Sequence, residues 1–131
     1  MEIDKLALIF IKDRKMLGTF SKGKNIFYMP GGKREQGETD EQALTRELKE
    51  EISVHLLPES ISYYGTFRAQ ADGKPEGTFV KITCYTGEFS GKIKPSSEVE
   101  RIDWLTSKDV QIASPVGIMI LNELKAKGLI D

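Results

Sequence analysis

The feature that most constrains the fold is a strongly patterned helix that follows a glycine-rich loop. Residues 41–52 contain good helix formers, and Thr39 with Gln42 three positions later has the spacing of a capping box, which predicts where the helix begins. Its apolar residues recur at a spacing of four and share one side: Leu44, Leu48 and Ile52. The loop before it, residues 30–37, carries glycines among polar residues, so its backbone can approach a ligand closely.

The rest of the sequence is typical of β-strands and one further helix. Strands separated by turn residues are expected at residues 5–12, 16–20, 26–29, 61–71, 78–89 and 99–105. The first two flank the polar turn at residues 13–15 and are expected to pair as a hairpin. Ser114 and Pro115 open a second helix, which is expected to end at Gly128. No repeat, low-complexity tract or linker interrupts this order.

Length, composition and charge exclude several classes of protein. The chain has 131 residues, which suits one domain, and 39% hydrophobic with 30% charged residues is typical of globular proteins. A formal net charge of -1 provides no overall field that would attract nucleic acid or an anionic membrane, so neither partner is expected. Cys84 is the only cysteine and cannot form an internal disulfide, which favours a reducing compartment. The apolar run at residues 6–11 is too short to span a membrane and lacks the basic start of a signal peptide. We therefore expect a single domain over residues 1–131 in the cytoplasm.

The side of the first helix that adjoins its apolar residues is acidic. Glu47, Glu50 and Glu51 fall within roughly 100° of arc, where carboxylates repel one another unless a cation or water screens them. Magnesium prefers oxygen ligands and would relieve this repulsion. His55 is the only histidine, so a histidine-rich zinc site is excluded, and a Ser-His-Asp hydrolase would depend on that residue alone. On composition alone, a solvated helix face is the alternative interpretation.

Arg46 lies at the edge of this acidic side. It can pair with Glu50 in the next turn or with Glu38 in the preceding loop. Either pairing would orient the acidic residues.

The order of these residues resembles a known family motif. Gly32, five residues, Glu38, seven residues and then residues 46–54 resemble the Nudix box, G-x5-E-x7-R-E-U-x-E-E-x-G-U, in which U is aliphatic. The sole departure is Ser53, where the family has a glycine that eases a left-handed turn after the helix. Residues 27–32 also resemble the strand that enters the box in this family.

The resemblance implies a fold, a reaction and a set of site residues. The fold would be α+β, a Nudix-type α/β/α sandwich with a mixed β-sheet between helices. The reaction would be hydrolysis of a diphosphate linkage with Mg2+, or Mn2+ in its place. By resemblance the metal ligands are Glu47, Glu50, Glu51, the Gly31 carbonyl and Glu98, with Glu100 as the alternate to Glu98. Glu47 is a ligand or the residue that activates water, and Arg46 with Glu38 is the supporting pair. A carboxylate of ordinary pKa can accept the proton of a metal-bound water, which agrees with these roles.

The substrate is less constrained than the reaction. The length of the chain and its local sequence resemble those of the Nudix enzymes that hydrolyse nucleoside triphosphates, including oxidised ones, to a monophosphate and pyrophosphate. The asparagine that those enzymes use to read the oxidised base is replaced here by Ser114, Pro115, Val116 and Gly117. ADP-ribose, nucleotide sugars and dinucleoside polyphosphates are the alternatives, although their usual markers are absent around residues 70–72. A non-catalytic nucleotide sensor is the alternative from another class.

Residues outside the box would choose the nucleotide. The aromatic candidates for stacking on a base are Phe27, Tyr28, Tyr63, Tyr64, Phe67 and Phe79, although strand aromatics more often belong to a core. The cationic candidates for contacting phosphates are Lys33, Arg34 and Arg68, each with ordinary solvation as the alternative. A small-molecule nucleotide is thus the expected partner, and the chain is expected to be a monomer or a homodimer.

Overall fold

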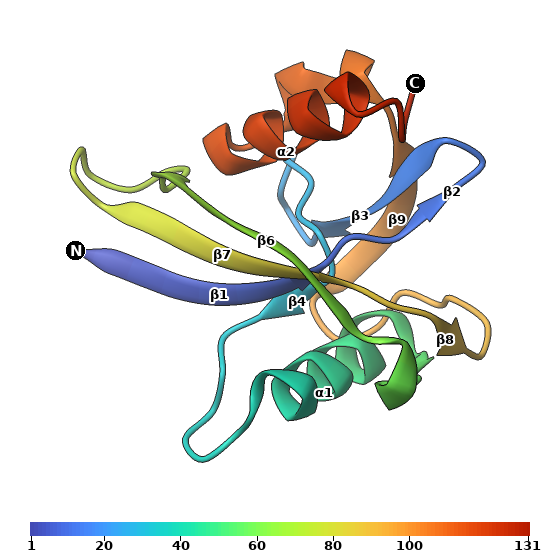
Figure 1. Cartoon of the computed structure of the whole chain (residues 1–131). Helices are drawn as coiled ribbons and strands as arrows, with labels where there is room; N and C mark the ends of the chain where they lie inside the picture. The colour runs from blue at the N-terminus through green and yellow to red at the C-terminus, as the bar shows by residue number, and fades with distance from the viewer.

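The computed structural model describes every residue from 1 to 131 and places two helices on opposite sides of a layer of strands (Figure 1). The helices are α1 (Asp40–Ile52) and α2 (Pro115–Ala126), and two short 3-10 helices are η1 (Pro58–Ser60) and η2 (Ser107–Ile112). The strands are β1 (Glu2–Leu8), β2 (Ile11–Lys12), β3 (Lys15–Ser21), β4 (Gly31–Gly32), β5 (His55–Leu56), β6 (Ser62–Gln70), β7 (Phe79–Thr86), β8 (Phe89–Ser90) and β9 (Val99–Leu105).

The main sheet is mixed. Its strand order is β4-β1-β7-β6, in which β1 and β7 run parallel while the other two pairs are antiparallel. A second, antiparallel sheet has the order β2-β3-β9. Parallel neighbours require a crossover, and here the chain between β1 and β7 forms α1 and most of the other strands. The expected α+β sandwich with a mixed sheet is confirmed.

Strand β1 divides the interior into two cores because successive side chains point to opposite faces of a sheet. Leu6 and Leu8 belong to the core that packs on α1, together with the apolar stripe of that helix. Ala7 and Ile9 belong to the larger core on the other face, which α2 covers. One strand therefore anchors both helices, and a one-residue slip of β1 would exchange its faces.

Helix α1 begins and ends as its sequence predicts. The Thr39 hydroxyl accepts from the Gln42 backbone N–H, and the Gln42 side chain accepts from the Thr39 N–H, so the capping box is present. The helix ends at Ser53, which takes the left-handed conformation at φ 62°. Its hydroxyl donates to the Lys94 carbonyl at 3.0 Å. Serine thus adopts the backbone geometry that glycine would take there, and it gains a hydrogen bond.

Two of the strand predictions are wrong in part. Only residues 11–12 of the expected first strand pair with β3, whereas residues 2–8 pair with β7 and β4. The apolar run crosses from one sheet to the other near Ile9 and Phe10, and its pairing partners lie far away in the sequence. The segment at residues 26–29 is no strand, since it makes only isolated bridges from Phe27 and Tyr28.

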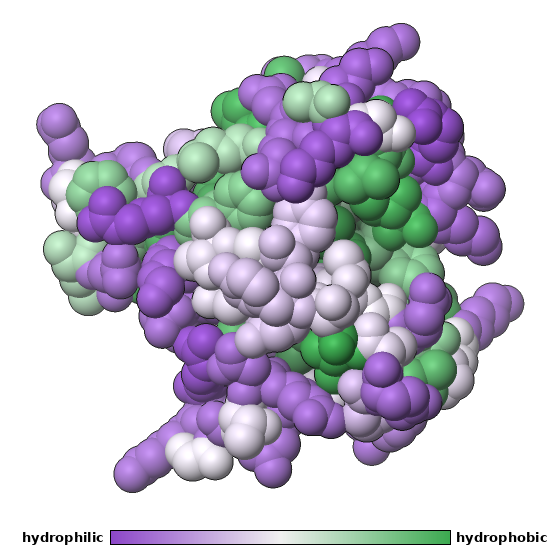
Figure 2. Space-filling view, in the orientation of Figure 1, coloured by the Kyte–Doolittle hydropathy of each residue, from purple (hydrophilic) through white to green (hydrophobic).

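The remaining expectations agree closely with the structure. Strands β6, β7 and β9 and helix α2 lie where the turn signals placed them. The turn between β2 and β3 holds Asp13 and Arg14 at positive φ, and Arg14 ties the C-terminus through Asp131 at 2.7 Å. Hydrophilic residues cover the periphery of the face drawn in Figure 2. Neither helix has both the length and the apolar character needed to cross a bilayer.

Candidate active site

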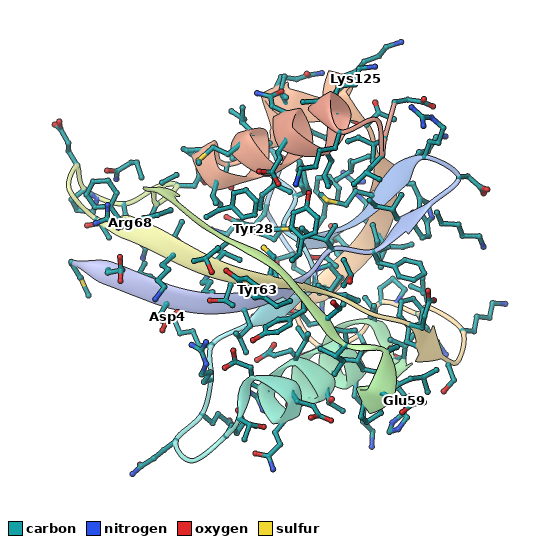
Figure 3. All side chains as sticks on the ribbon, in the orientation of Figure 1. Asp4, Tyr28, Glu59, Tyr63, Arg68 and Lys125 are labelled. Carbon is teal, nitrogen blue, oxygen red and sulfur yellow. The ribbon has the colours of Figure 1, made fainter.

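A cleft of about 420 Å³ opens between α2, the main sheet and the end of α1. Its walls come from β1, β3, β4, β7, α1 and the first turn of α2. Tyr28 lies in it, and Figure 3 shows this side chain between α2 and the main sheet. The lining mixes apolar side chains with carboxylates and lysines, and the volume falls within the usual range for small-molecule sites.

Glu51 is the most perturbed carboxylate of the cleft. Its Oε1 accepts a hydrogen bond from the Gly31 backbone N–H at 2.9 Å. The pKa of Glu51 is raised to about 8, mainly by burial and also by the negative charges of Glu47, Glu98 and Glu50, while the Gly31 hydrogen bond opposes the rise. The side chain is therefore largely protonated at neutral pH unless a cation compensates its charge.

Glu47 lies beside Glu51 in the same cleft, and its side chain is 16% exposed. Burial raises its pKa, the carboxylates of Glu50 and Glu98 add to that effect, and the Arg46 guanidinium opposes it. Gly32 leaves room for this carboxylate, because a Cβ at position 32 would lie 2.6 Å from the Glu47 Cδ. A side chain at position 32 would displace Glu47.

Gly31 has a separate reason to be glycine. Its φ is +150°, and a Cβ built there would lie 2.1 Å from the carbonyl oxygen of Leu6 on β1. Close approach of β4 to β1 therefore requires glycine, and this approach aims the Gly31 N–H at Glu51.

Arg46 organises the acidic side from its edge. Its Nε and Nη2 donate to both oxygens of Glu38 at 2.8 and 2.9 Å, and Nη1 donates to Glu47 at 2.8 Å. A contact to Glu50 is longer, at 3.6 Å. Both pairings expected for Arg46 are present, with Glu38 the tighter partner. Hydrogen bonding from Arg46 lowers the pKa of Glu38 to about 2, so Glu38 stays ionised.

The other expected site residues do not all lie together. Glu98 lines the cleft beside Glu47 and Glu51, whereas Glu100 is exposed and outside it. Glu50 is 52% exposed and is not part of the cleft lining. The structure therefore places Glu98 nearer to the cluster than its alternate.

The chemistry of these donors fits a hard divalent cation. The cleft contains partly desolvated carboxylates and neither histidine nor cysteine. Carboxylate oxygens are the ligands that magnesium prefers. No group of three acidic, histidine or cysteine side chains is gathered closely enough to form a complete metal site. Arg46 engages Glu47, and the Gly31 N–H engages Glu51.

The candidates outside the box separate clearly. Phe27 and Tyr28 line the cleft, while the other four aromatic candidates do not, and Tyr63 is 60% exposed. Of the expected cations, only Lys33 faces the cleft. The other two are occupied elsewhere, because Arg34 pairs with Asp40 and Arg68 pairs with Glu2.

Sequence reasoning missed three lysines that line the cleft: Lys5, Lys24 and Lys74. They belong to no motif. One signal was available in the sequence, at Lys5: this charged residue alternates with Ile3 and Ala7 on the face of β1 that lines the cleft. A charge at an inward position of a strand is unusual, and it indicates a site or a partner.

The fold and the cleft define a small α+β domain in which a helix rich in carboxylates lies beside a ligand-sized cleft. Residues 4–120 match the family described as the NUDIX domain. The chain therefore belongs to the Nudix hydrolase family, whose members act on substrates that contain a phosphoanhydride bond and generally use a divalent metal.

Relatives and solved structures agree with this membership. An ADP-ribose pyrophosphatase of Methanocaldococcus jannaschii is 32% identical over 99 residues, which are 73% of this chain and 57% of that protein. The chain thus spans little more than half the length of that curated relative. A putative Nudix hydrolase of Chromobacterium violaceum is 25% identical with a TM-score of 0.69, covering 94% of this chain and 76% of that one. A MutT Nudix hydrolase of Burkholderia pseudomallei shares the fold with a TM-score of 0.77 at 19% identity, covering 95% of this chain and 98% of that one.

Proposed function

We propose that this chain is a magnesium-dependent pyrophosphohydrolase that converts a nucleoside triphosphate, canonical or oxidised, to a monophosphate and pyrophosphate. The observation that carries the proposal is the placement of Glu47 and Glu51 at the wall of a cleft of about 420 Å³ that also has apolar walls. A nucleoside suits the apolar part of the cleft, and its phosphates suit the cation that the carboxylates need.

The residues proposed to hold the metal are Glu47, Glu50, Glu51, the Gly31 carbonyl and Glu98. When bound, the metal would neutralise the diphosphate charge and lower the pKa of a water ligand. Glu50 would have to turn inward from its exposed position, and Glu47 would have to share its carboxylate with Arg46.

The remaining roles belong to side chains of the box. Glu47 is proposed as a further ligand or as the base that takes the proton from the attacking water. Arg46 and Glu38 are proposed as positioning residues, since the Arg46 guanidinium holds Glu38 and Glu47 at the same time. Gly32 keeps the space next to Glu47 open.

A second candidate substrate is ADP-ribose. The archaeal relative named as an ADP-ribose pyrophosphatase favours it. Nucleotide sugars and dinucleoside polyphosphates contain the same type of linkage and complete the set. A non-catalytic nucleotide sensor is the remaining alternative. A protein that only binds a nucleotide would have no need for several carboxylates whose partial burial is energetically unfavourable.

The test is a hydrolysis screen of the purified chain with and without Mg2+ against canonical and oxidised nucleoside triphosphates, ADP-ribose, nucleotide sugars and dinucleoside polyphosphates. We expect pyrophosphate release from one or more triphosphates, and loss of that activity in Glu50→Gln and Glu98→Gln. Glu100→Gln is the matched control, because Glu100 is exposed outside the cleft. Turnover of ADP-ribose alone would favour the second candidate, and no turnover at all would favour the sensor.

A further inference from the structure

Lys5 carries a positive charge at an inward-facing position of β1. Its register partner is Ile82 on β7, and its side chain is half-buried at the wall of the cleft. No carboxylate lies within 4.0 Å of its ammonium group. Its Nζ instead lies over the Tyr28 ring, 5.8 Å from the ring centroid. A partly desolvated ammonium without an ionic partner is unfavourable, so its retention at this position calls for a ligand.

Other lysines add to this charge instead of relieving it. Burial lowers the pKa of Lys5, the ammonium groups of Lys33 and Lys74 lower it further, and Glu51 and Glu47 oppose them. Lys33 follows β4, and Lys74 lies in the turn between β6 and β7, so the positive charges converge from separate segments. We call Lys5, Lys33 and Lys74 the cleft lysines; Lys24 also lines the cleft but is not among the charges that shift the pKa of Lys5.

Four carboxylates share the cleft with these lysines: Glu47, Glu51, Asp72 and Glu98. Burial raises the pKa of Tyr28 and the charge of Asp72 adds to that effect, so Asp72 acts on the Tyr28 side of the cleft. Glu47, Glu51 and Glu98 are among the proposed metal ligands, so a bound divalent cation would offset their negative charge. The cleft lysines would then leave uncompensated positive charge in the cleft, which favours a bound anion beside them.

A phosphate group fits that position best. Ammonium groups bind phosphate as point charges, and two or three of them match the double negative charge of a terminal phosphate monoester. The position also adjoins the carboxylates, since Glu51 and Glu47 act on Lys5 through the same cleft. A phosphate held there would therefore lie next to the linkage that is cut.

We propose that the cleft lysines, with Lys5 as the central contact, bind the phosphate beyond the cleaved linkage and so select substrates with a terminal phosphate over diphosphate diesters such as ADP-ribose. The inference rests on the proposed hydrolase function for its biological meaning. The binding of the phosphate chain itself is measurable without any turnover.

The binding test uses titration calorimetry with inorganic tripolyphosphate and pyrophosphate in the presence of Mg2+. Lys5→Met keeps most of the length of the stem and removes the charge, and it should weaken tripolyphosphate binding about 10-fold or more, as expected for loss of one charge-assisted contact. Pyrophosphate binding should change by less than about 3-fold, because its two phosphates would bind at the metal and would not reach the Lys5 contact. Lys12→Met, on an exposed position of β2 outside the cleft, is the matched control.

Several outcomes would overturn the inference. Equal losses for both phosphate chains would place Lys5 at the cleaved diphosphate, and unchanged binding would remove it from the site. Lys5→Arg should restore most of the tripolyphosphate affinity, since it returns a positive charge. The melting temperature of Lys5→Met should match or exceed that of the wild type, because a desolvated charge is gone; a large decrease would indicate a structural role.

A kinetic arm separates this inference from the proposed function. Lys5→Met should raise KM for a nucleoside triphosphate about 10-fold with kcat little changed, while any turnover of ADP-ribose stays unaffected. Equal effects on both substrates would contradict the selection. If the wild type hydrolyses nothing, the proposed function fails, while the calorimetric comparison still decides whether Lys5 binds the third phosphate.

Discussion

Replacing Glu51 with glutamine should stabilise the metal-free protein at neutral and alkaline pH. Glutamine keeps the shape of the side chain and an oxygen that can accept the Gly31 N–H, but it carries no charge. Burial raises the pKa of Glu51 from 4.5 to about 8. A carboxyl whose pKa is raised on folding contributes its full stability below the unfolded pKa, and it loses that contribution as the pH rises through the folded value.

The size of the effect follows from the same shift. At about 1.4 kcal/mol per pKa unit, the interval from 4.5 to about 8 corresponds to an upper value of about 5 kcal/mol. The carboxylate faces an open cleft, where water screens its charge, and this reduces the expected difference to about 2 kcal/mol. For a domain of this size, that difference corresponds to a rise in Tm of about 6–10 °C.

The assay is thermal unfolding of the wild type and Glu51→Gln in chelator at pH 4 and pH 9. The two should melt together at pH 4, and the variant should melt higher at pH 9. Glu41→Gln, at an exposed position of the same helix, is the control and should show no such trend. A difference that does not change with pH would refute the argument from burial of the charge. Adding Mg2+ at pH 9 should raise the Tm of the wild type more than that of the variant.

Two substitutions of small residues test other parts of the box. Gly32→Ala should lower kcat at least about 10-fold, because its Cβ would meet the Glu47 carboxyl at 2.6 Å. Gly37→Ala is the control, since Gly37 has φ +84° and nothing lies within 4 Å of the added Cβ. This control should lose about 1 kcal/mol of stability and keep its activity. Ser53→Ala should lower the free energy of unfolding by about 1 kcal/mol, since it loses the bond to Lys94 and keeps the left-handed backbone. Ser53→Gly loses that bond and also the strain, so its unfolding free energy in urea should stay within about 0.5 kcal/mol of the wild type. Equal losses in both Ser53 variants would contradict this division.

Local sequence signals predicted the elements whose causes are local. The capping box at Thr39 and the proline after Ser114 placed both helices closely, because caps act within one turn. The expected hairpin at residues 5–20 failed over most of its length. Strand β1 pairs instead with β7, some seventy residues away in the sequence, and no property of the apolar run itself indicates so distant a partner.

The same distinction applies to the cleft. The helix pattern predicted that Arg46 would pair with Glu38 or Glu50, because these residues lie in the helix and in the loop just before it. It could not predict that Glu50 would lie outside the cleft lining, since that depends on how α1 packs on β1 and β4. The lysines were missed because the fold, and not a motif, brings their segments together.

Most of the carboxylates come from one helix and the lysines from separate segments, and this difference affects how substrate preference can change. Glu47, Glu50 and Glu51, which are proposed to hold the metal, lie on a helix that also supplies the apolar stripe of one core, so they cannot move without loss of packing. Lys74 lies in an exposed turn, and Lys5 points into the cleft instead of filling the core. Substitutions at those two positions would alter the charge of the cleft while leaving α1 in place. If the cleft lysines select the terminal phosphate, Lys5→Met combined with Lys74→Met should shift preference from triphosphates toward diesters, with the Mg2+ requirement of the reaction unchanged.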